Sequence, residues 1–258
     1  MPDLSVAVIA LDEEDRIRAC LESVAWADEV VVVDSGSSDK TVEVAREFTD
    51  RVLFHAWAGY GAQKNFALAQ CRGAWILSLD ADERVSEPLR DEIRTVLAAD
   101  PPVVGFFVPR QNFFQGRWIR HGGWYPDYQL RLFRRGRGAF TEAAVHESVR
   151  VDGPAARLRS PLVHQSYRGI EDFVARASRY AELAARHLAD EGRGGSAVDL
   201  LIRPAWRFLR MYVVQLGFLD GWRGLVLAAL YAQYVFIRGA RVRELLAQRS
   251  RDPGGAPR

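Results

Sequence analysis

Residues 30–39 read VVVVDSGSSD, a run of four valines that ends in an aspartate and a turn. A short β-branched run bounded by turn residues is typical of a strand buried on both faces of a sheet. A carboxylate directly after such a strand lies at the sheet edge where α/β proteins bind ligands. Asp34 is therefore a candidate for hydrogen bonds to a base or a ribose. The alternative is a turn in which Asp and Ser only cap the backbone.

Strand and helix signals alternate on both sides of this stretch. Further strands are expected at residues 5–10, 51–56 and 74–79, and apolar residues at helical spacing lie between them, as in residues 17–24. Strands that alternate with helices at this spacing predict βαβ units. The expected fold is therefore α/β, with a doubly wound, mostly parallel sheet.

The second half of the chain changes character. Residues 103–168 are rich in aromatic residues and Arg, and we expect irregular strands and loops that complete the sheet of a domain at residues 1–168. Residues 169–258 predict a helical extension, which ends in a disordered tail from Ser250.

The net charge of +2 conceals an asymmetry along the chain. Residues 1–100 hold 10 Lys and Arg against 20 Asp and Glu, whereas residues 198–258 hold 10 against 4. An acidic part suits a cation, and a basic part suits phosphate or an anionic membrane.

Cysteine usage and the chain start narrow the class of protein. Only Cys20 and Cys71 are present, which excludes a disulfide scaffold and a Cys-based zinc site. The first residues lack a signal-peptide pattern, and no apolar run reaches about 18 residues, so a cytoplasmic protein without a spanning helix is expected.

A second strand end is acidic, in the stretch WILSLDADE at residues 75–83. Asp80, Asp82 and Glu83 repel one another unless a cation or solvent screens them. Carboxylate oxygens suit Mg²⁺ or Mn²⁺, which also take phosphate oxygens. The alternatives are a solvated acidic turn or a phosphatase motif of the form Asp-x-Asp-x-Thr/Val; Arg84 at the fifth position disfavours the phosphatase.

Together with other motifs, these two strand ends resemble family-2 glycosyltransferases of the GT-A fold. The set is most similar to the bacterial subgroup that adds a sugar, often glucose, to the lipopolysaccharide inner core. One departure is Asp12, which stands where the family usually has Asn. The stretches that carry the resemblance are Ser5–Ala10 with Glu13-Glu14, Val33–Thr41, Gln63-Lys64-Asn65, Asp80–Glu83, Gly122–Asp127, Gln129–Phe133, Val145-His146-Glu147 and Phe218–Gly221.

The resemblance implies a donor site for a sugar nucleotide. Asp34 would hold the uracil or ribose, and Lys64 would contact the nucleotide. Asp80 would reach the ribose or the metal, and Asp82 would ligate Mg²⁺ or Mn²⁺ on the diphosphate. For Lys64 the alternative is an ordinary surface lysine, yet the chain has only two Lys.

The remaining candidate residues lie after residue 125. Glu147 resembles the family's general base, with Asp127 as the next candidate, and a salt-bridged Glu is the alternative. Arg131 and Arg134 are candidates for bidentate contacts to the phosphates. His164 is a candidate further metal ligand, with a structural histidine as the alternative.

Residues 224–237 are nearly all apolar and lie between Arg223 and Arg238. As a helix this run is about 21 Å long, which is short of the roughly 30 Å hydrocarbon core. We expect it to lie flat on an anionic membrane surface, which makes the protein peripheral on the cytoplasmic side of the inner membrane. Packing on the catalytic domain or a dimer contact is the alternative, and no nucleic-acid motif is found.

The leading hypothesis is an inverting, metal-dependent transferase that moves a sugar from a nucleotide-diphosphate donor, a UDP-sugar, to a lipid-linked saccharide of the lipopolysaccharide core. A second hypothesis is a transferase that acts on polyprenyl phosphate or another polysaccharide. A third is a catalytically inactive, membrane-attached binding protein, against which the intact Asp80, Asp82 and Glu147 argue.

Overall fold

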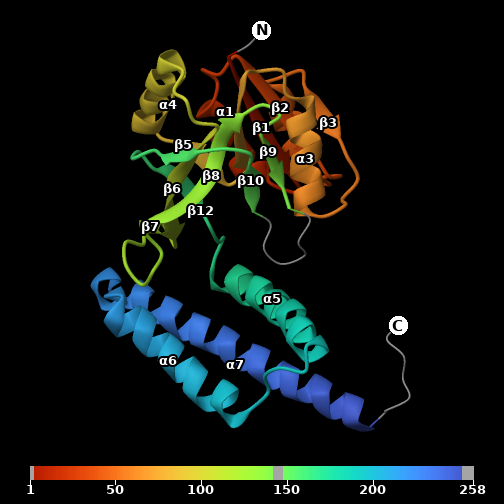
Figure 1. Cartoon of the computed structure of the whole chain (residues 1–258), viewed down its shortest axis with the longest axis vertical. Coiled ribbons are helices and arrows are strands. Elements are labelled where there is room, and N and C mark those ends of the chain that lie inside the picture. Colours follow the sequence, from red (N-terminus) through yellow and green to blue (C-terminus); the bar gives the residue numbers. More distant parts are fainter. Residues whose placement is uncertain (1–2, 142–147, 252–258) are drawn as a thin grey trace. The chain divides into compact units, whose positions relative to one another are not determined.

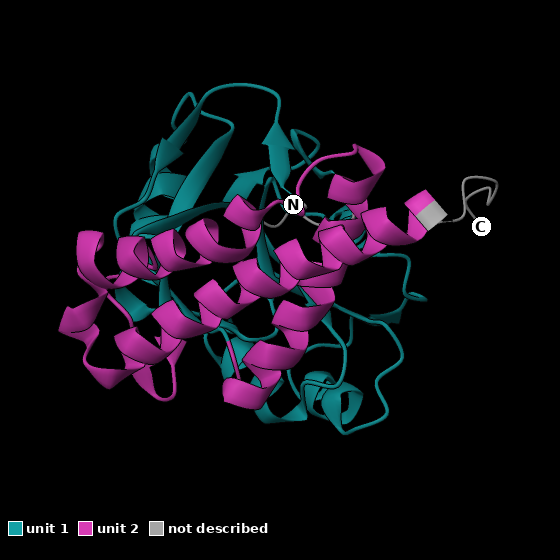
Figure 2. Cartoon of the chain, turned by 90° about the horizontal axis from the view of Figure 1, so that it is seen from below, with its two compact units in different colours: residues 1–112, 126–166 teal, residues 113–125, 167–258 magenta. Residues whose placement is uncertain are grey.

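The computed structural model describes residues 3–141 and 148–251 (Figure 1). The chain divides into two compact units, coloured separately in Figure 2. Unit 1 comprises residues 1–112 and 126–166, and unit 2 comprises residues 113–125 and 167–258. This division differs from the expected break at residue 168, because residues 113–125 leave the first unit and join the second.

Unit 1 is built on a mixed sheet whose strand order is β3-β2-β1-β4-β8-β6-β12-β5. Its first four members in that order are parallel, and β8 pairs antiparallel with β4 and β6. A separate hairpin, β9–β10, follows. The strands are β1 (Leu4–Ala10), β2 (Glu29–Asp34), β3 (Val52–Phe54), β4 (Trp75–Asp80), β5 (Glu83–Val85), β6 (Gly105–Phe114), β7 (Arg117–Trp118), β8 (Asp127–Arg134), β9 (Gly138–Phe140), β10 (Val149–Val151), β11 (Ala155–Arg157) and β12 (Leu162–Gln165).

Helices cover both faces of this sheet because its central strands are apolar on both sides. In β1, Val6 and Val8 face a core shared with α1 (Glu14–Glu22), α2 (Thr41–Arg46) and α4 (Glu87–Ala99). Ala7 and Ile9 face the opposite core, which α3 (Tyr60–Gln70) and the β9–β10 hairpin cover. The predicted α/β fold with a doubly wound sheet is confirmed.

The register of the sheet brings two acidic strand ends to one edge. Ala10 at the end of β1 pairs with Asp34 of β2, and Ile9 pairs with Asp80 of β4. The chain runs outward through β1, β2 and β3 and then returns to place β4 on the other side of β1. Such a reversal of strand order leaves a crevice at the carboxyl ends of the strands, where ligands bind.

Unit 2 is helical. Its α-helices are α5 (Ile170–Asp190), α6 (Arg203–Leu209) and α7 (Trp222–Arg251), and α7 packs against both of the others (Figure 2). Short π- and 3₁₀-helical segments flank α6: η1 (Val198–Ile202), η2 (Arg210–Val214) and η3 (Gly217–Asp220). Phe114, Ile119 and Trp124 are buried in the core of this unit, which explains why residues 113–125 belong to it.

The FLDG stretch at residues 218–221 has a structural role. The Asp220 carboxylate accepts hydrogen bonds from the backbone N–H groups of Arg120 and His121 at 3.2 and 2.8 Å. A Cβ on Gly224 would lie 1.8 Å from the carbonyl oxygen of Gly217, so only glycine fits there. This motif of the resemblance therefore shapes the turn before α7.

The apolar run at residues 224–237 lies inside a single helix of 30 residues, α7. Residues Trp222–Ser250 are long and apolar enough, by length and composition, to cross a membrane, and 28% of the most apolar window is buried inside the protein. This corrects the expectation that no segment reaches spanning length. The polar residues that end the apolar run do not end the helix, because Arg, Glu and Gln are good helix formers.

Candidate active site

Asp34 is buried at the end of β2, where it organises its own turn. One carboxylate oxygen accepts hydrogen bonds from the N–H groups of Gly36 and Ser37 at 2.8 and 2.9 Å, and the other accepts from the Ser37 hydroxyl. Gln63 on α3 donates to the Ser35 hydroxyl at 2.8 Å. The capping alternative therefore describes these contacts, and the role of Asp34 toward a nucleotide stays a prediction.

Asp12 links the loop after β1 to this turn. Its φ of 53° lies in the left-handed region, which Asp and Asn tolerate better than other side chains. One carboxylate oxygen accepts from the Ser38 N–H at 2.8 Å and from the Ser38 hydroxyl at 3.1 Å. Residue 12 must adopt a left-handed backbone conformation and must also accept these hydrogen bonds through its side chain. Asp meets both requirements, as Asn would.

Asp80, at the end of β4, lies between two positively charged side chains. Lys64 Nζ is 2.8 Å from Oδ1, and the Arg131 guanidinium donates to Oδ2 at 2.8 Å. Burial tends to raise the pKa of Asp80, but Lys64 and Arg131 outweigh it and hold that pKa far below its usual range. The structure thus brings together three predicted site residues, with both oxygens of Asp80 engaged by the protein.

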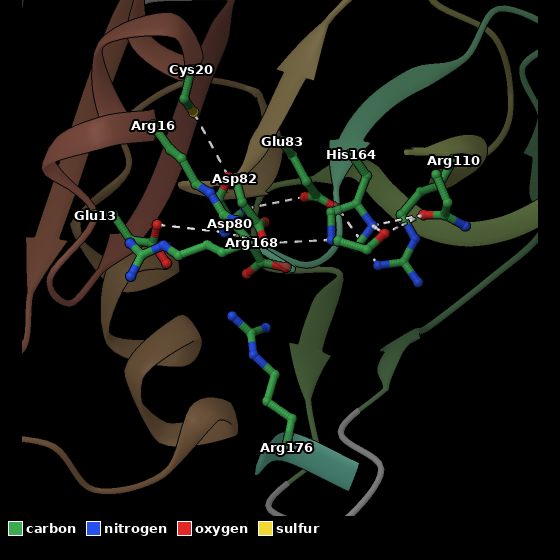
Figure 3. A network of polar contacts seen from close by, with 12 residues as sticks. Glu13, Arg16, Cys20, Asp80, Asp82, Glu83, Arg110, His164, Arg168 and Arg176 are labelled. Carbon is green, nitrogen blue, oxygen red and sulfur yellow. Dashed lines mark hydrogen bonds and ion pairs between the residues drawn. The ribbon is translucent and has the colours of Figure 1, made fainter. Parts of the chain in front are cut away.

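A buried carboxylate extends this arrangement. Glu83 is fully buried; one oxygen accepts from Arg131 at 2.6 Å and the other from the Asp80 N–H at 3.0 Å. Arg110 on β6 lies 3.6 Å from Glu83 and donates to Asp127 at 2.8 Å. Figure 3 shows Asp80, Glu83 and Arg110 in this network.

Sequence reasoning missed Arg110 and the buried position of Glu83. A signal was present on β8, where Asp127, Gln129 and Arg131 alternate and therefore share one face of the sheet. Arg110 gave no such signal, because it is one of 33 arginines and only strand pairing sets it opposite Asp127.

Asp127 is the alternative candidate for the base. Burial tends to raise its pKa, but Arg110 and hydrogen bonds from Gln129, Arg110 and Asn112 lower it below the usual range. A carboxylate with a lowered pKa is a poorer proton acceptor. Asp127 is therefore better suited to binding a hydroxyl than to deprotonating it.

Asp82 differs from Asp80 because one of its oxygens has no partner. Oδ1 is buried and accepts no hydrogen bond from the described residues. Oδ2 lies 3.5 Å from His164 Nε2 and 3.7 Å from the Arg16 guanidinium (Figure 3). His164 Nδ1 is 2.7 Å from Asn112 Oδ1, which can only accept. The Ser166 hydroxyl also lies 3.1 Å from Nδ1. In the tautomer in which Nδ1 donates to Asn112, the lone pair of Nε2 is directed toward Asp82.

This pair fits a divalent cation. In that tautomer the carboxylate oxygen and the imidazole lone pair, 3.5 Å apart, are both electron-pair donors, and a cation between them would satisfy both. Over residues 3–141 and 148–251, no group of three His, Cys, Asp or Glu is placed to hold a metal. Two protein ligands are enough for Mg²⁺ or Mn²⁺ when substrate phosphates complete the shell.

Arg134 lies away from these residues. It pairs with Trp75 at the start of β4 and donates to Asp100 at 2.7 Å and to the Val103 carbonyl at 3.1 Å. It ends β8, about 23 Å along the strand from Asp127 at the rise of an extended chain. The structure does not bring Arg134 to the site, because it lies at the opposite end of β8 from Asp127.

Glu147 lies outside the described residues and stays a prediction. The segments on either side of 142–147 are anchored: the Thr141 N–H donates to the Ser148 carbonyl at 3.0 Å. Asn65, next to Lys64 on α3, exchanges hydrogen bonds with the backbone of Phe140 at 3.0 and 2.8 Å. Of the described residues that flank Glu147, Phe140 is therefore held against α3.

The buried network predicts a stability effect for Glu83→Gln. The change keeps the shape but removes the charge that offsets Arg131 and Arg110, so we expect the free energy of unfolding to fall by about 3 kcal/mol, as when a buried ion pair loses one partner. Urea denaturation measures the difference. The control is Glu22→Gln, an exposed glutamate on α1 that should leave stability unchanged. Equal unfolding free energies for the Glu83 variant and the wild type would contradict the network.

The comparisons with known proteins agree on one family. The model of glycosyl transferase family 2 matches residues 5–160. The lipopolysaccharide core biosynthesis glycosyltransferase LpsC of Rhizobium meliloti is 31% identical and covers 96% of this chain and 94% of its own. An uncharacterised glycosyltransferase of Rickettsia typhi is 30% identical over 95% of this chain and 88% of its own.

Among solved structures, TarS 1–349 of S. aureus in complex with UDP is similar at 19% identity and a TM-score of 0.49. The similarity covers 95% of this chain and 91% of TarS 1–349. The family match extends over more than half of the chain. The predicted GT-A fold is confirmed, and the chain belongs to glycosyl transferase family 2.

Proposed function

We propose that this protein is an inverting transferase that moves a sugar, glucose, from a UDP-sugar to a lipid-linked saccharide of the lipopolysaccharide core. The family match supports glycosyl transfer, and the similarity to LpsC over 96% of the chain supports the acceptor class. The acceptor is built on a membrane, so we place the protein on the cytoplasmic side of the inner membrane, with its donor drawn from the cytosol.

The observation that carries the proposal is the partnerless oxygen of Asp82 beside His164, at the edge that also holds Lys64 and Arg131. Lys64 and Arg131 are donors suited to the oxygens of a diphosphate. Asp82 and His164 are the residues that would hold Mg²⁺ or Mn²⁺. When bound, such a cation would neutralise negative charge on the leaving nucleotide diphosphate.

The reaction joins an acceptor hydroxyl to the anomeric carbon of the donor sugar. The hydroxyl oxygen forms the new bond as the bond from that carbon to the diphosphate breaks, and attack from the opposite side inverts the configuration. Glu147 takes the hydroxyl proton. Asp127, ionised beside Arg110, accepts hydrogen bonds from hydroxyls of the sugars.

A donor screen tests this function. Thermal unfolding is followed with UDP-glucose, UDP-galactose, UDP-GlcNAc and GDP-mannose, each with and without Mn²⁺, because a ligand that binds the folded state raises the unfolding temperature. We expect the largest rise with UDP-glucose and Mn²⁺ together. The stabilising donor is then incubated with truncated lipopolysaccharide, and mass spectrometry detects the added hexose.

The outcomes separate the hypotheses. A hexose added to truncated lipopolysaccharide supports the proposal, and one added only to polyprenyl phosphate supports the second hypothesis. Binding of the donor without transfer to either acceptor and without hydrolysis supports the inactive binding protein. No stabilisation by any nucleotide sugar contradicts the proposal.

A further inference from the structure

The exposed apolar side chains of the described residues are concentrated in unit 2. Of the 19 large apolar side chains that are exposed, 12 lie between Val198 and Leu225, in η1, α6, η2, η3 and the start of α7. We call these exposed residues the α6 surface. The six that are more than half exposed are Leu201, Ile202, Trp206, Val214, Leu219 and Trp222.

The arrangement of these side chains is that of a helix face. Ile202, Trp206, Leu209 and Val213 recur at intervals of four, three and four residues, which places them along one side of the helical segment. Met211, from the same segment, is buried in the core of unit 2. Helix α6 packs on one side of α7 and α5 packs on α7 as well (Figure 1), so α7 is the inner helix of this unit.

The charges around this surface are positive. Arg203 and Arg210 are exposed and Arg207 is half-buried, on the same segment as the exposed apolar residues. The acidic residues of this stretch are Asp199 and Asp220, and both are buried. Asp199 accepts from the Ser196 N–H at 3.0 Å and pairs with Arg203 at 2.5 Å, and Asp220 accepts from the N–H of His121 at 2.8 Å. Arg207 and Arg210 are therefore the arginines of this segment whose charge is not offset by Asp199 or Asp220.

We propose that the α6 surface binds an anionic lipid surface. Exposed apolar side chains that include tryptophans, interleaved with arginines and free of exposed acids, are suited to the interface of an anionic bilayer. A symmetric dimer through this surface would bring the arginines of two copies together with no exposed acid to offset them. The inference rests on the proposed function in one respect: the lipid-linked acceptor is what gives this protein a reason to bind a membrane.

This surface is not the one expected from the apolar run. Leu227, Ala228 and Val235 of that run are buried inside unit 2. Farther along α7, Arg241 donates to Glu182 of α5 at 2.6 Å, and a Cβ on Gly239 would meet the Asp199 carbonyl at 3.0 Å. Helix α7 is thus held by its neighbours at these positions, and most of the exposed apolar side chains lie in α6, its flanking turns and the first residues of α7.

Vesicle flotation tests the proposal with the full chain, without donor or acceptor. Vesicles of phosphatidylcholine alone are compared with vesicles that also contain phosphatidylglycerol. We expect binding to the anionic vesicles, weakened by high salt and released by alkaline carbonate. Arg207→Gln with Arg210→Gln should lower that binding by about 25-fold, at roughly 1 kcal/mol for each arginine. Trp206→Ser should lower it by about tenfold through lost apolar burial.

Matched controls change the same residue types elsewhere. Arg46→Gln with Arg150→Gln removes two exposed arginines of unit 1, and Phe54→Ser removes an aromatic side chain that is 70% exposed. These variants should bind as the wild type does. All the altered side chains except Arg207 are exposed, and unchanged thermal unfolding verifies the fold of every variant.

Three results would overturn the proposal. Equal binding to both kinds of vesicle, or to neither, removes the anionic surface as partner. Resistance to carbonate shows that α7 spans the bilayer, and a concentration-dependent dimer that Trp206→Ser dissociates assigns the surface to a second copy. If the wild type does not bind vesicles but transfers sugar to a detergent-solubilised acceptor, this proposal alone is wrong. If the wild type binds vesicles but transfers no sugar, the proposed function alone is wrong.

Discussion

Replacing Asp82 by Ala is expected to abolish sugar transfer and to remove the effect of Mn²⁺ on nucleotide binding. Asp82 carries the partnerless oxygen and lies beside His164, so the substitution removes one of the two groups that fit the cation. Loss of charge neutralisation on the leaving diphosphate typically costs several kcal/mol of transition-state stabilisation. Transfer assays and calorimetric titration of UDP with and without Mn²⁺ measure both effects.

The fold of the Asp82 variant should survive. The apo protein loses a carboxylate whose buried Oδ1 accepts no hydrogen bond within residues 3–141 and 148–251, so its stability should hold or rise. The control is Asp152→Ala, whose side chain is 93% exposed, and it should retain full activity. Full transfer by the wild type in EDTA, or by the Asp82 variant with Mn²⁺, would contradict the metal site.

Replacing Glu147 by Gln is expected to lower kcat by at least about 10²-fold, which is typical for the loss of a general base. Glutamine keeps the size of the side chain but cannot take the hydroxyl proton, so the affinity for the donor should change little. Steady-state kinetics gives kcat, and titration with UDP gives the affinity.

Glu142→Gln is the matched control, because it makes the same change five residues earlier in the chain. It should turn over as the wild type does. Near-normal turnover by the Glu147 variant would show that another group takes the proton. In that case Asp127→Asn is the next variant, although the lowered pKa of Asp127 argues against it.

Much of the fold could be read from local patterns. Val30–Val33 and Trp75–Leu79 are apolar on both faces and end in carboxylates, so a sheet with helices on both sides and an acidic edge follows from burial and chain direction. The pairing of Ala10 with Asp34 and of Ile9 with Asp80 confirms that both acidic strand ends meet at one edge.

The positions of the arginines could not be read in the same way. Arg131 and Arg134 lie on one strand, three residues apart, and looked alike as phosphate ligands. The antiparallel pairing of β8 with β4 directs Arg131 to Asp80 and leaves Arg134 beside Trp75 at the opposite end. Strand direction, which depends on contacts far apart in the chain, made the difference.

The sequence by itself determined the family, the α/β sheet and its acidic edge, because these depend on short-range periodicity and on motifs. Only the tertiary structure decided which carboxylate is available: Lys64 and Arg131 pair with Asp80, whereas Asp82 has a buried oxygen with no hydrogen-bond partner among the described residues. It also decided which apolar residues face outward: Leu227, Ala228 and Val235 of α7 are buried, whereas Leu201, Ile202 and Trp206 in and before α6 are exposed. Both outcomes follow from the packing of segments distant in sequence, which no local pattern encodes.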